Sequence, residues 1–425
     1  MKVGAAVVDI TTPLGMEMYG YEARVGGATG IHDPLHARVL VAEGQDRTTV
    51  ALVVADLLQI EERLQDIIAS EVLRSTGIPR EHLQLAGTHT HSGPFFAAPS
   101  DVETATGLAI AGAVARAWAD RREATAAVGI GHVDGIAANR RPTGGPVDDR
   151  VTVTRFDDMD GHPIATHVNY GCHPTTLGPD NNLYSADFPG VACARIEEAV
   201  GGKAIFSTGP QGDVNPGGYS PEGSMVGVVV PWRTFESAER YGRDIADVAI
   251  AVHGDLRPVA SDRVWGASRI VELRRKALPE PAIARAAADG AATSAAAVRE
   301  AALSPDASYH AIVAAAYADM IALQAADPQR DGPVRIRISA LALGPLLHLG
   351  VSGELFVALG QQIRAAVGDE TSCVAALCDG YGGYLPTADA FEIGAYEPNA
   401  SLIVAGEGER LVEAVVELAS EAPGA

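Results

Sequence analysis

The chain has 425 residues, of which 47% are hydrophobic and 20% charged, as is typical of a folded globular protein with one large domain or two joined ones. Lys and Arg number 32 and Asp and Glu number 54, so the formal net charge is −22 at pH 7. A negative field repels nucleic acid and anionic membrane, which makes both poor candidates for partners. No stretch approaches 18 uninterrupted apolar residues, so the sequence also predicts no membrane insertion.

The N-terminus begins MKVGAAVVDI, a short apolar run with β-branched residues that predicts a first strand and not a signal peptide. None of the four cysteines has CxxC spacing, and a core of this size does not need disulfide bonds. We therefore expect reduced thiols and a cytoplasmic protein. The cysteines are Cys172, Cys193, Cys373 and Cys378.

Apolar β-branched runs alternate with helical patterns along the chain. The predicted strands are Lys2–Val8, Ala37–Ala42, Thr48–Ala55, Val151–Phe156, Ile164–Tyr170, Ala204–Ser207, Arg263–Val271, Val334–Ala342 and Leu346–Gly350. The predicted helices are Glu61–Thr76, Val102–Arg121, Pro189–Val200, Trp232–His253, Glu354–Val367 and Glu407–Ser420. This mixture predicts an α/β or mixed α+β fold, with mixed β-sheets covered by helices.

One segment differs from the rest of the chain. Residues Leu278–Asp327 are rich in Ala, nearly free of Gly and interrupted at Ser304–Pro305, which predicts a helical hairpin. Propensity alone favours an outer layer on the sheet over a cap on an active site.

The most informative string is GTHTHSGP, residues Gly87–Pro94, which follows the short apolar run Leu83–Ala86. In an extended strand, residues i and i+2 point to the same side, so His89 and His91 are expected to approach one point. Metallo-β-lactamase-type sites need HxHxDH, amidohydrolase barrels place HxH after their first strand, and HExxH is absent here. These three zinc-enzyme classes therefore fit poorly.

Four further strings place polar residues after strands or in glycine-rich loops, where ligands commonly bind. Each taken alone is as consistent with a structural role as with a functional one; Glu354, for instance, is expected to open a helix, where a carboxylate can simply balance the helix dipole. The strings are NYGCHPTTL (Asn169–Leu177), FSTGPQGDVNP (Phe206–Pro216), SGELF (Ser352–Phe356) and DGYGGYLPT (Asp379–Thr387).

Taken together and in this order, the strings resemble the neutral, non-lysosomal ceramidase family. The likeness begins at Asp9 and covers almost all 425 residues, although the helical hairpin aligns loosely. Its other motifs are MYGY (Met18–Tyr21), IHDPLHAR (Ile31–Arg38), THTHSGP, NRRP (Asn139–Pro142), the His173 segment, GDV (Gly212–Val214), GEL (Gly353–Leu355) and the Tyr381, Tyr384 and Tyr396 region.

The resemblance implies one zinc ion per chain, bound by His89, His173, Glu354 and Tyr384. Imidazole and carboxylate ligands suit a catalytic zinc with water completing its coordination. A phenol, with a pKa of about 10, must be acidified by the metal or remain a weak ligand. Tyr384 is also a candidate for hydrogen-bonding the oxyanion as the reaction proceeds.

The implied reaction is attack of a zinc-activated water on an amide carbon. His91, near the metal but outside its ligands, is the candidate for hydrogen-bonding the oxyanion or protonating the leaving amine. Asp213 is expected to orient the water or a histidine. Arg140 is expected to bind a polar group of the substrate or to brace a loop carboxylate. Tyr396 and Tyr381 are expected to line the substrate pocket.

Two departures from the family narrow the substrate. The GDV loop of ceramidases continues with a serine that activity requires, whereas this chain has Asn215, which cannot act as a nucleophile and is expected to position the substrate. We also expect one catalytic domain, residues 1–425, without the family's C-terminal immunoglobulin-like domain. The sequence therefore favours a soluble N-acyl or peptide-like amide over ceramide.

Several alternatives stay open on this evidence. The same zinc site suits an ester or lactone hydrolase, or an acyltransferase that uses an amine in place of water. A phosphoester or sulfate-ester hydrolase ranks lower, because only Arg140 and Arg141 lie near the motifs. The acyl and amine parts of the substrate, the native metal and homo-oligomer formation are not decided by the sequence.

Overall fold

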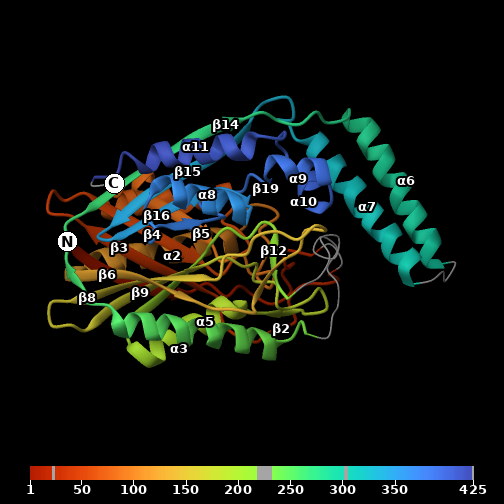
Figure 1. Cartoon of the computed structure of the whole chain (residues 1–425). Helices are drawn as coiled ribbons and strands as arrows, with labels where there is room; N and C mark the ends of the chain where they lie inside the picture. The colour runs from red at the N-terminus through yellow and green to blue at the C-terminus, as the bar shows by residue number, and fades with distance from the viewer. Residues whose placement is uncertain (22–23, 218–231, 301–304, 424–425) are drawn as a thin grey trace.

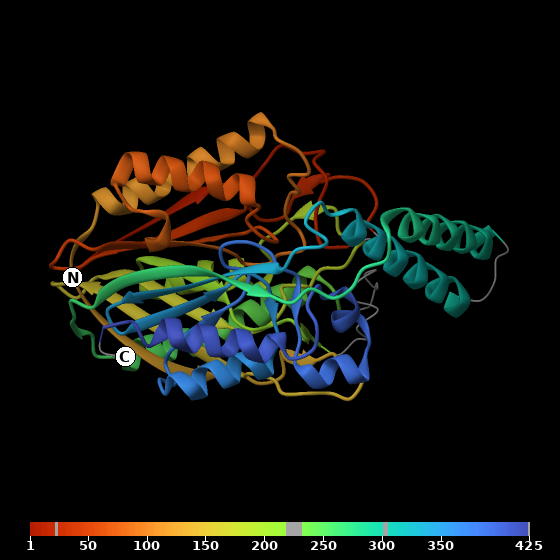
Figure 2. The same cartoon turned by 90° about the horizontal axis from the view of Figure 1, so that it is seen from above.

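The centre of the protein is a pair of β-layers stacked face to face, with helices on both outer sides (Figures 1 and 2). The computed structural model describes residues 1–21, 24–217, 232–300 and 305–423. The two termini lie at one end of the molecule, and a helical hairpin projects from the other end. The architecture confirms the predicted mixed α+β class.

A nine-stranded mixed sheet has the order β11-β9-β8-β6-β1-β3-β4-β5, and β13 also pairs with β6. Only two residue pairs join β6 to β1, and β11 packs against β3, so the sheet bends there and its two halves face each other. In that order the strands are Lys203–Thr208, Pro163–Tyr170, Arg150–Asp158, Arg122–His132, Lys2–Asp9, His36–Glu43, Thr49–Ala55 and Leu83–Gly87, with β13 at Val259–Ala260.

A second sheet, β14-β15-β16-β18, extends the layer formed by β6, β8, β9 and β11. The backbone N–H of Ala376 donates to the Thr208 carbonyl oxygen at 3.0 Å, which joins its β18 side to the β11 edge. The four strands are Val264–Leu273, Val334–Leu343, Leu346–Val351 and Cys373–Ala375.

Strands of the β1–β5 half are buried on both faces because a core lies on each side of them. In β3, Val39 and Val41 face the core under helices α1 and α2, whereas Leu40 and Ala42 face the core between the two β-layers. Alternate residues of one strand thus serve two cores. The covering helices are α1 (Glu62–Thr76) and α2 (Asp101–Ala119) over this half, α3 (Asp187–Val200) and α5 (Phe235–Asp255) over β6–β11, and α8 (Val357–Val367) and α11 (Glu407–Ala419) over the second sheet.

Short elements complete the fold within the described residues. Three two-stranded pairs and three short helices lie among the loops: β2 (Gly30–Ile31) with β10 (Leu183–Tyr184), β7 (Ala137–Asn139) with β12 (Val214–Pro216), β17 (Glu354–Leu355) with β19 (Tyr384–Leu385), η1 (Arg80–His82), α9 (Ala388–Ile393) and α10 (Tyr396–Ala400).

The predicted strands are confirmed, and so are the predicted helices apart from two starts. Helix α5 begins at Phe235 and not at Trp232, and the other exception is α8. That helix begins at Val357, and Glu354 lies in strand β17, so the expectation that Glu354 opens a helix is wrong. Strand β6 was missed, because its sequence REATAAVGIGH is poor in β-branched residues. A Cβ on its Gly131 would lie 2.4 Å from Val248 of α5, so glycine allows this helix to pack closely on the strand.

The predicted hairpin consists of α6 (Pro281–Glu300) and α7 (Pro305–Ala326), with residues 301–304 outside the described part of the chain. Its helices pack on each other through alanines, including Ala284 and Ala322. The hairpin projects from the body, so the expected outer layer on a sheet is wrong.

The four cysteines are buried free thiols, as expected. Within the described ranges, no helix has both the length and the apolar character needed to cross a membrane.

Candidate metal centre and the surrounding pocket

A cavity of about 370 Å³ lies where α7 of the hairpin meets the body of the protein. Three β-segments deliver its polar groups: His89 follows β5, His173 follows β9, and Glu354 follows β16. The lining residues are Met18, Tyr19, Gly20, Tyr21, Leu58, His89, His91, Arg140, His173, Thr175, Ala316, Met320, Glu354, Tyr381, Tyr384 and Tyr396.

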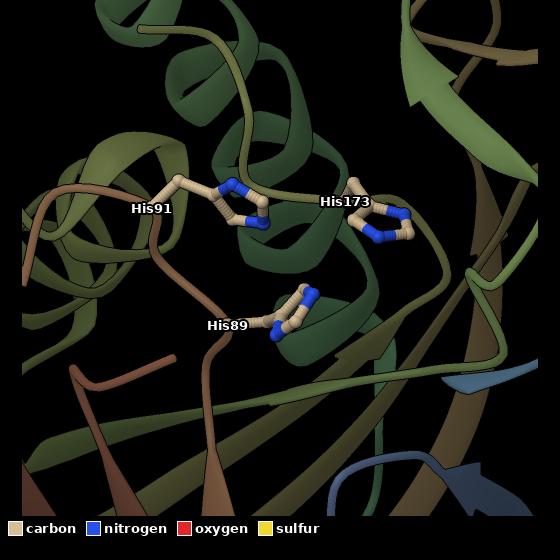
Figure 3. Close-up of side chains that lie close together, drawn as sticks. All are labelled: His89, His91 and His173. Carbon is tan, nitrogen blue, oxygen red and sulfur yellow. The ribbon is translucent and has the colours of Figure 1, made fainter. Parts of the chain in front are cut away.

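His89 and His91 approach each other by a different route from the one expected. Strand β5 ends at Gly87, and His89 has a positive φ of 72°, so the two side chains are not i and i+2 neighbours on one strand face. Their ring centroids are nevertheless 4.9 Å apart, and those of His89 and His173 are also 4.9 Å apart. Figure 3 shows the three imidazoles around one common space.

Hydrogen bonds decide which imidazole nitrogens face this space. Nδ1 of His89 lies 2.8 Å from the Leu58 carbonyl oxygen, and Nδ1 of His173 lies 3.0 Å from that of Val214. A carbonyl oxygen only accepts, so in the neutral rings both Nδ1 atoms carry the proton and both Nε2 atoms keep a lone pair. Glu354 Oε2 lies 2.9 Å from His173 Nε2 and 3.6 Å from His89 Nε2.

The charge states of these groups leave the three converging atoms electron-rich. Burial, with the Arg140 charge, lowers the pKa of His173 to about 4, so the ring is neutral at pH 7. Burial alone would raise the pKa of Glu354, but its contacts with His173 and His89 outweigh that effect and hold the pKa well below the usual range. The carboxylate is therefore ionised only while a cation, either a proton on one imidazole or a metal ion, lies between it and the two Nε2 atoms.

His91 belongs to the same cluster. One nitrogen from each of His89, His91 and His173 lies within 4.8 Å of the other two. Neither ring nitrogen of His91 has a hydrogen-bond partner among the described residues, although the residue is only 9% exposed. Burial, followed by His89 and His173, lowers its pKa well below the ordinary value. Its two uncommitted nitrogens are suited to a ligand or to a transferred proton.

These residues fit a divalent transition metal such as zinc. Two ligand atoms of one tetrahedral zinc, each about 2.0–2.1 Å from the metal, lie about 3.3 Å apart. This value falls between the distances of Glu354 Oε2 from His173 Nε2 and from His89 Nε2, which are 2.9 Å and 3.6 Å. Each Nδ1–H bonded to a backbone carbonyl is also the usual way in which a protein orients a metal-binding imidazole.

Tyr381, Tyr384 and Tyr396 all line the cavity. The Tyr381 hydroxyl donates to Glu354 Oε1 at 2.6 Å and so holds the carboxylate in place. Tyr384 pairs with Glu354 through the backbone of β17 and β19, and its ring lies 5.2 Å from that of Tyr396. Burial, followed by the Glu354 charge, raises the pKa of Tyr384 well above the usual value.

Arg140 lines the cavity and also braces its wall, the second of its two expected roles. Nε donates to Glu397 Oε1 at 2.7 Å, Nη1 to Asn215 Oδ1 at 2.9 Å, and Nη2 to the Tyr384 hydroxyl at 3.1 Å. Asn215 is wholly buried and is not part of the described cavity wall. In the structure the carbonyl oxygen of Asn215 accepts from Arg140, and the expectation that Asn215 positions the substrate stays a prediction.

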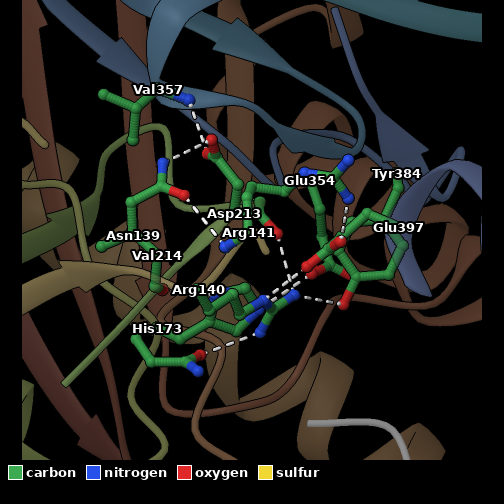
Figure 4. A network of polar contacts seen from close by, with 12 residues as sticks. Asn139, Arg140, Arg141, His173, Asp213, Val214, Glu354, Val357, Tyr384 and Glu397 are labelled. Atoms are coloured by element: carbon green, nitrogen blue, oxygen red, sulfur yellow. Dashed lines mark hydrogen bonds and ion pairs between the residues drawn. The ribbon is translucent and has the colours of Figure 1, made fainter. Parts of the chain in front are cut away.

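Asp213 also lies behind the cavity and does not orient a histidine. Its Oδ1 accepts from the backbone N–H of Val357, at the start of α8, and its Oδ2 from Asn139 Nδ2, each at 2.9 Å (Figure 4). The neighbouring residue, Val214, orients His173 through its carbonyl oxygen. Burial raises the pKa of Asp213 to about 6.

Sequence reasoning missed several groups that shape the site. The carbonyl oxygens of Leu58 and Val214 orient the histidines, but backbone atoms leave no side-chain signal. Glu397 stands next to Tyr396 and was not assigned a role, although it is fully buried between two arginines. Ala316 and Met320 reach the cavity from the hairpin, and nothing in an Ala-rich helix indicated this.

Comparison with known proteins agrees with this geometry. The family model described as neutral/alkaline non-lysosomal ceramidase, N-terminal, matches residues 1–258, which include the three histidines of the cluster. The chain is 26% identical to neutral ceramidase B of Dictyostelium discoideum over 263 residues, 52% of this chain and 36% of that protein. It is 26% identical to the neutral ceramidase of Mycobacterium tuberculosis over 281 residues, 57% of this chain and 44% of that protein.

The matched segments thus span less than half the length of these curated relatives. The crystal structure of neutral ceramidase from Pseudomonas aeruginosa shares the fold, with a TM-score of 0.74 and 19% identity, over 98% of this chain and 74% of that one. The family match covers more than half of the chain and contains the histidine cluster. The chain therefore belongs to the neutral/alkaline non-lysosomal ceramidase family.

Proposed function

We propose that this protein is a zinc-dependent hydrolase that cleaves the amide bond of a soluble N-acyl or peptide-like substrate. The observation that carries the proposal is the convergence of two imidazole lone pairs and one ionised carboxylate on the wall of a cavity. Membership of a family whose named relatives are neutral ceramidases supports amide hydrolysis.

His89, His173 and Glu354 would hold the metal, with Tyr384 and His91 beside them as the remaining candidate ligands. When bound, zinc supplies a Lewis acid for the carbonyl oxygen and acidifies a water molecule. Tyr381 keeps the Glu354 carboxylate in one orientation, because its hydroxyl donates to the oxygen that faces away from the histidines.

The other side chains bind and position the substrate. The neutral His91 keeps a lone pair on one ring nitrogen, so it could take the proton released by the attacking water and then donate it to the leaving amine. Arg140 donates to the Tyr384 hydroxyl oxygen, so the hydroxyl proton can point toward Tyr396 or toward a substrate oxygen. The tyrosine rings and Met320 offer an apolar surface to an acyl group.

Two observations support a substrate smaller than a long-chain sphingolipid. The cavity of about 370 Å³ lies near the lower end of the range for ligand pockets, roughly 300–1,000 Å³. In addition, Asn215 provides no hydroxyl at the position that follows the GDV motif. Ester hydrolysis on the same site is the alternative, and acyl transfer differs from it only in the acceptor.

The test combines metal analysis with chelation, zinc rescue and a panel of N-acyl amides and esters. We expect about one zinc per chain, loss of activity on chelation, and loss of both metal and turnover in His89→Ala. The matched control is His132→Ala, whose imidazole is exposed and lies outside the cavity. If His89→Ala hydrolyses the best substrate as fast as the parent, the site assignment is wrong. An added amine distinguishes hydrolysis from transfer by its products.

A further inference from the structure

A buried carboxylate behind the cavity connects two arginines of one loop. Glu397 belongs to α10 and is 0% exposed. Its Oε1 accepts from Arg140 Nε and its Oε2 from Arg141 Nη1, both at 2.7 Å, as Figure 4 shows. Such a triad has a net charge of +1, and all three side chains are at most 5% exposed. Leaving either partner of a buried pair uncompensated is costly.

The two carboxylate oxygens of Glu397 bind Arg140 and Arg141, which have different roles. Arg140 lines the cavity and donates to the Tyr384 hydroxyl and to Asn215. The described cavity wall does not include Arg141, which instead donates to the backbone carbonyl of Gly394 at 2.8 Å and so anchors a loop.

The contact of Glu397 with Nε also sets the orientation of the other nitrogens of the Arg140 guanidinium. Because the five N–H donors lie in one rigid plane, fixing Nε against Glu397 also fixes the direction of Nη2 toward Tyr384. Among the described acceptors of Arg140, Glu397 carries a negative charge, whereas Asn215, the Gly212 carbonyl and the Tyr384 hydroxyl are neutral. Glu397 therefore also reduces the positive charge beside the histidine cluster.

We propose that Glu397 is a positioning residue for the metal pocket: through Arg140 it holds the Tyr384 hydroxyl in place, and its charge offsets that of Arg140 next to the cation site. This inference rests on the proposed function, because it assigns Glu397 a role toward the zinc that His89, His173 and Glu354 would bind. A merely structural Glu397 would stabilise the loop through Arg141 and leave the pocket unchanged.

Two variants separate these roles because they change the charge of the triad in opposite directions. Glu397→Gln raises its net charge by one and weakens the contact with Arg140. Arg141→Met lowers the net charge by one, keeps the apolar stem, and leaves Oε1 bound to Arg140. Both break a buried ion pair, so both are expected to lower the free energy of unfolding.

Zinc affinity of the metal-free proteins is measured by competition with a chromophoric chelator. We expect Glu397→Gln to weaken zinc binding about tenfold, as one added unit charge near a buried cation site requires, and Arg141→Met to leave it unchanged or tighter. On the best amide substrate, Glu397→Gln should lower kcat about tenfold per bound zinc with KM within about twofold, whereas Arg141→Met should keep kcat within about twofold.

The outcomes distinguish this inference from the function on which it rests. If both variants weaken zinc binding alike, or if Arg141→Met loses as much kcat as Glu397→Gln, the role of Glu397 is structural and the inference is wrong. If the affinities follow the expected order but the parent hydrolyses no amide or ester, the proposed function fails and the role of Glu397 stands. If the parent binds no zinc, both fail.

Discussion

Replacing Gly20 with alanine tests whether the position of His91 matters for turnover. Gly20 has a φ of 113° and lies against the imidazole: an added Cβ would be 2.4 Å from His91 Nδ1 and 2.5 Å from Cγ. Ordinary contacts begin at 3.4 Å, so the ring and the loop must separate by about 1 Å. A displacement of that size at a reacting group costs about a hundredfold in rate.

Gly15 provides the matched control because it shares the backbone strain without the collision. Its φ is 89°, and an added Cβ would meet nothing within 4 Å. Each alanine in such a conformation costs about 1–2 kcal/mol of stability. Both variants should therefore lose this much stability in urea unfolding, with a larger loss for Gly20→Ala because of its collision with His91, while Gly20→Ala alone loses turnover.

The assay compares kcat/KM per bound zinc for the parent, Gly15→Ala and Gly20→Ala on the best amide substrate. We expect a loss of about a hundredfold for Gly20→Ala and less than about twofold for Gly15→Ala. Equal activity of the two variants would refute the argument that the close contact between Gly20 and His91 sets the position of the imidazole.

Two further predictions concern the hairpin and a buried acid. Ala316→Phe fills part of the cavity from α7 and should lower kcat/KM for an octanoyl amide, relative to an acetyl amide, at least about tenfold. The control Leu323→Phe, on the exposed face of the same helix, should leave this ratio unchanged. If Ala316→Phe and Leu323→Phe give the same ratio, α7 takes no part in substrate selection. Burial raises the pKa of Asp56 from 3.8 to about 7, so the stabilising contribution of this carboxyl is complete below about pH 4 and is lost as pH rises through 7. Relative to the parent, Asp56→Asn should therefore gain up to about 4 kcal/mol of unfolding free energy between pH 4 and pH 8, and parallel pH profiles in urea unfolding would contradict this.

Local patterns were sufficient for most of the secondary structure and for the residue types of the site. The alternation in Ile164–Tyr170 and the amphipathic pattern of Glu407–Ser420 come from short-range physics, since each element must bury one face or both. Strand β6 was not predicted because its alanines and glycines, which allow helix α5 to pack closely on it, are weak signals of a strand. Helix α5 lies more than 100 residues later in the chain, so no local pattern indicates this packing.

The sequence by itself determined that two histidine strings, one carboxylate and several tyrosines were present in the order typical of the family. Only the tertiary structure decided which atoms meet. His89, His173 and Glu354 follow strands of three different sheet segments, and the bend between β6 and β1 brings these strand ends together. That bend depends on the core shared by the β-layers, a long-range property that no window of sequence contains. For the same reason, the placement of His91 in the cluster and of Glu397 behind Arg140 emerged only from the folded chain.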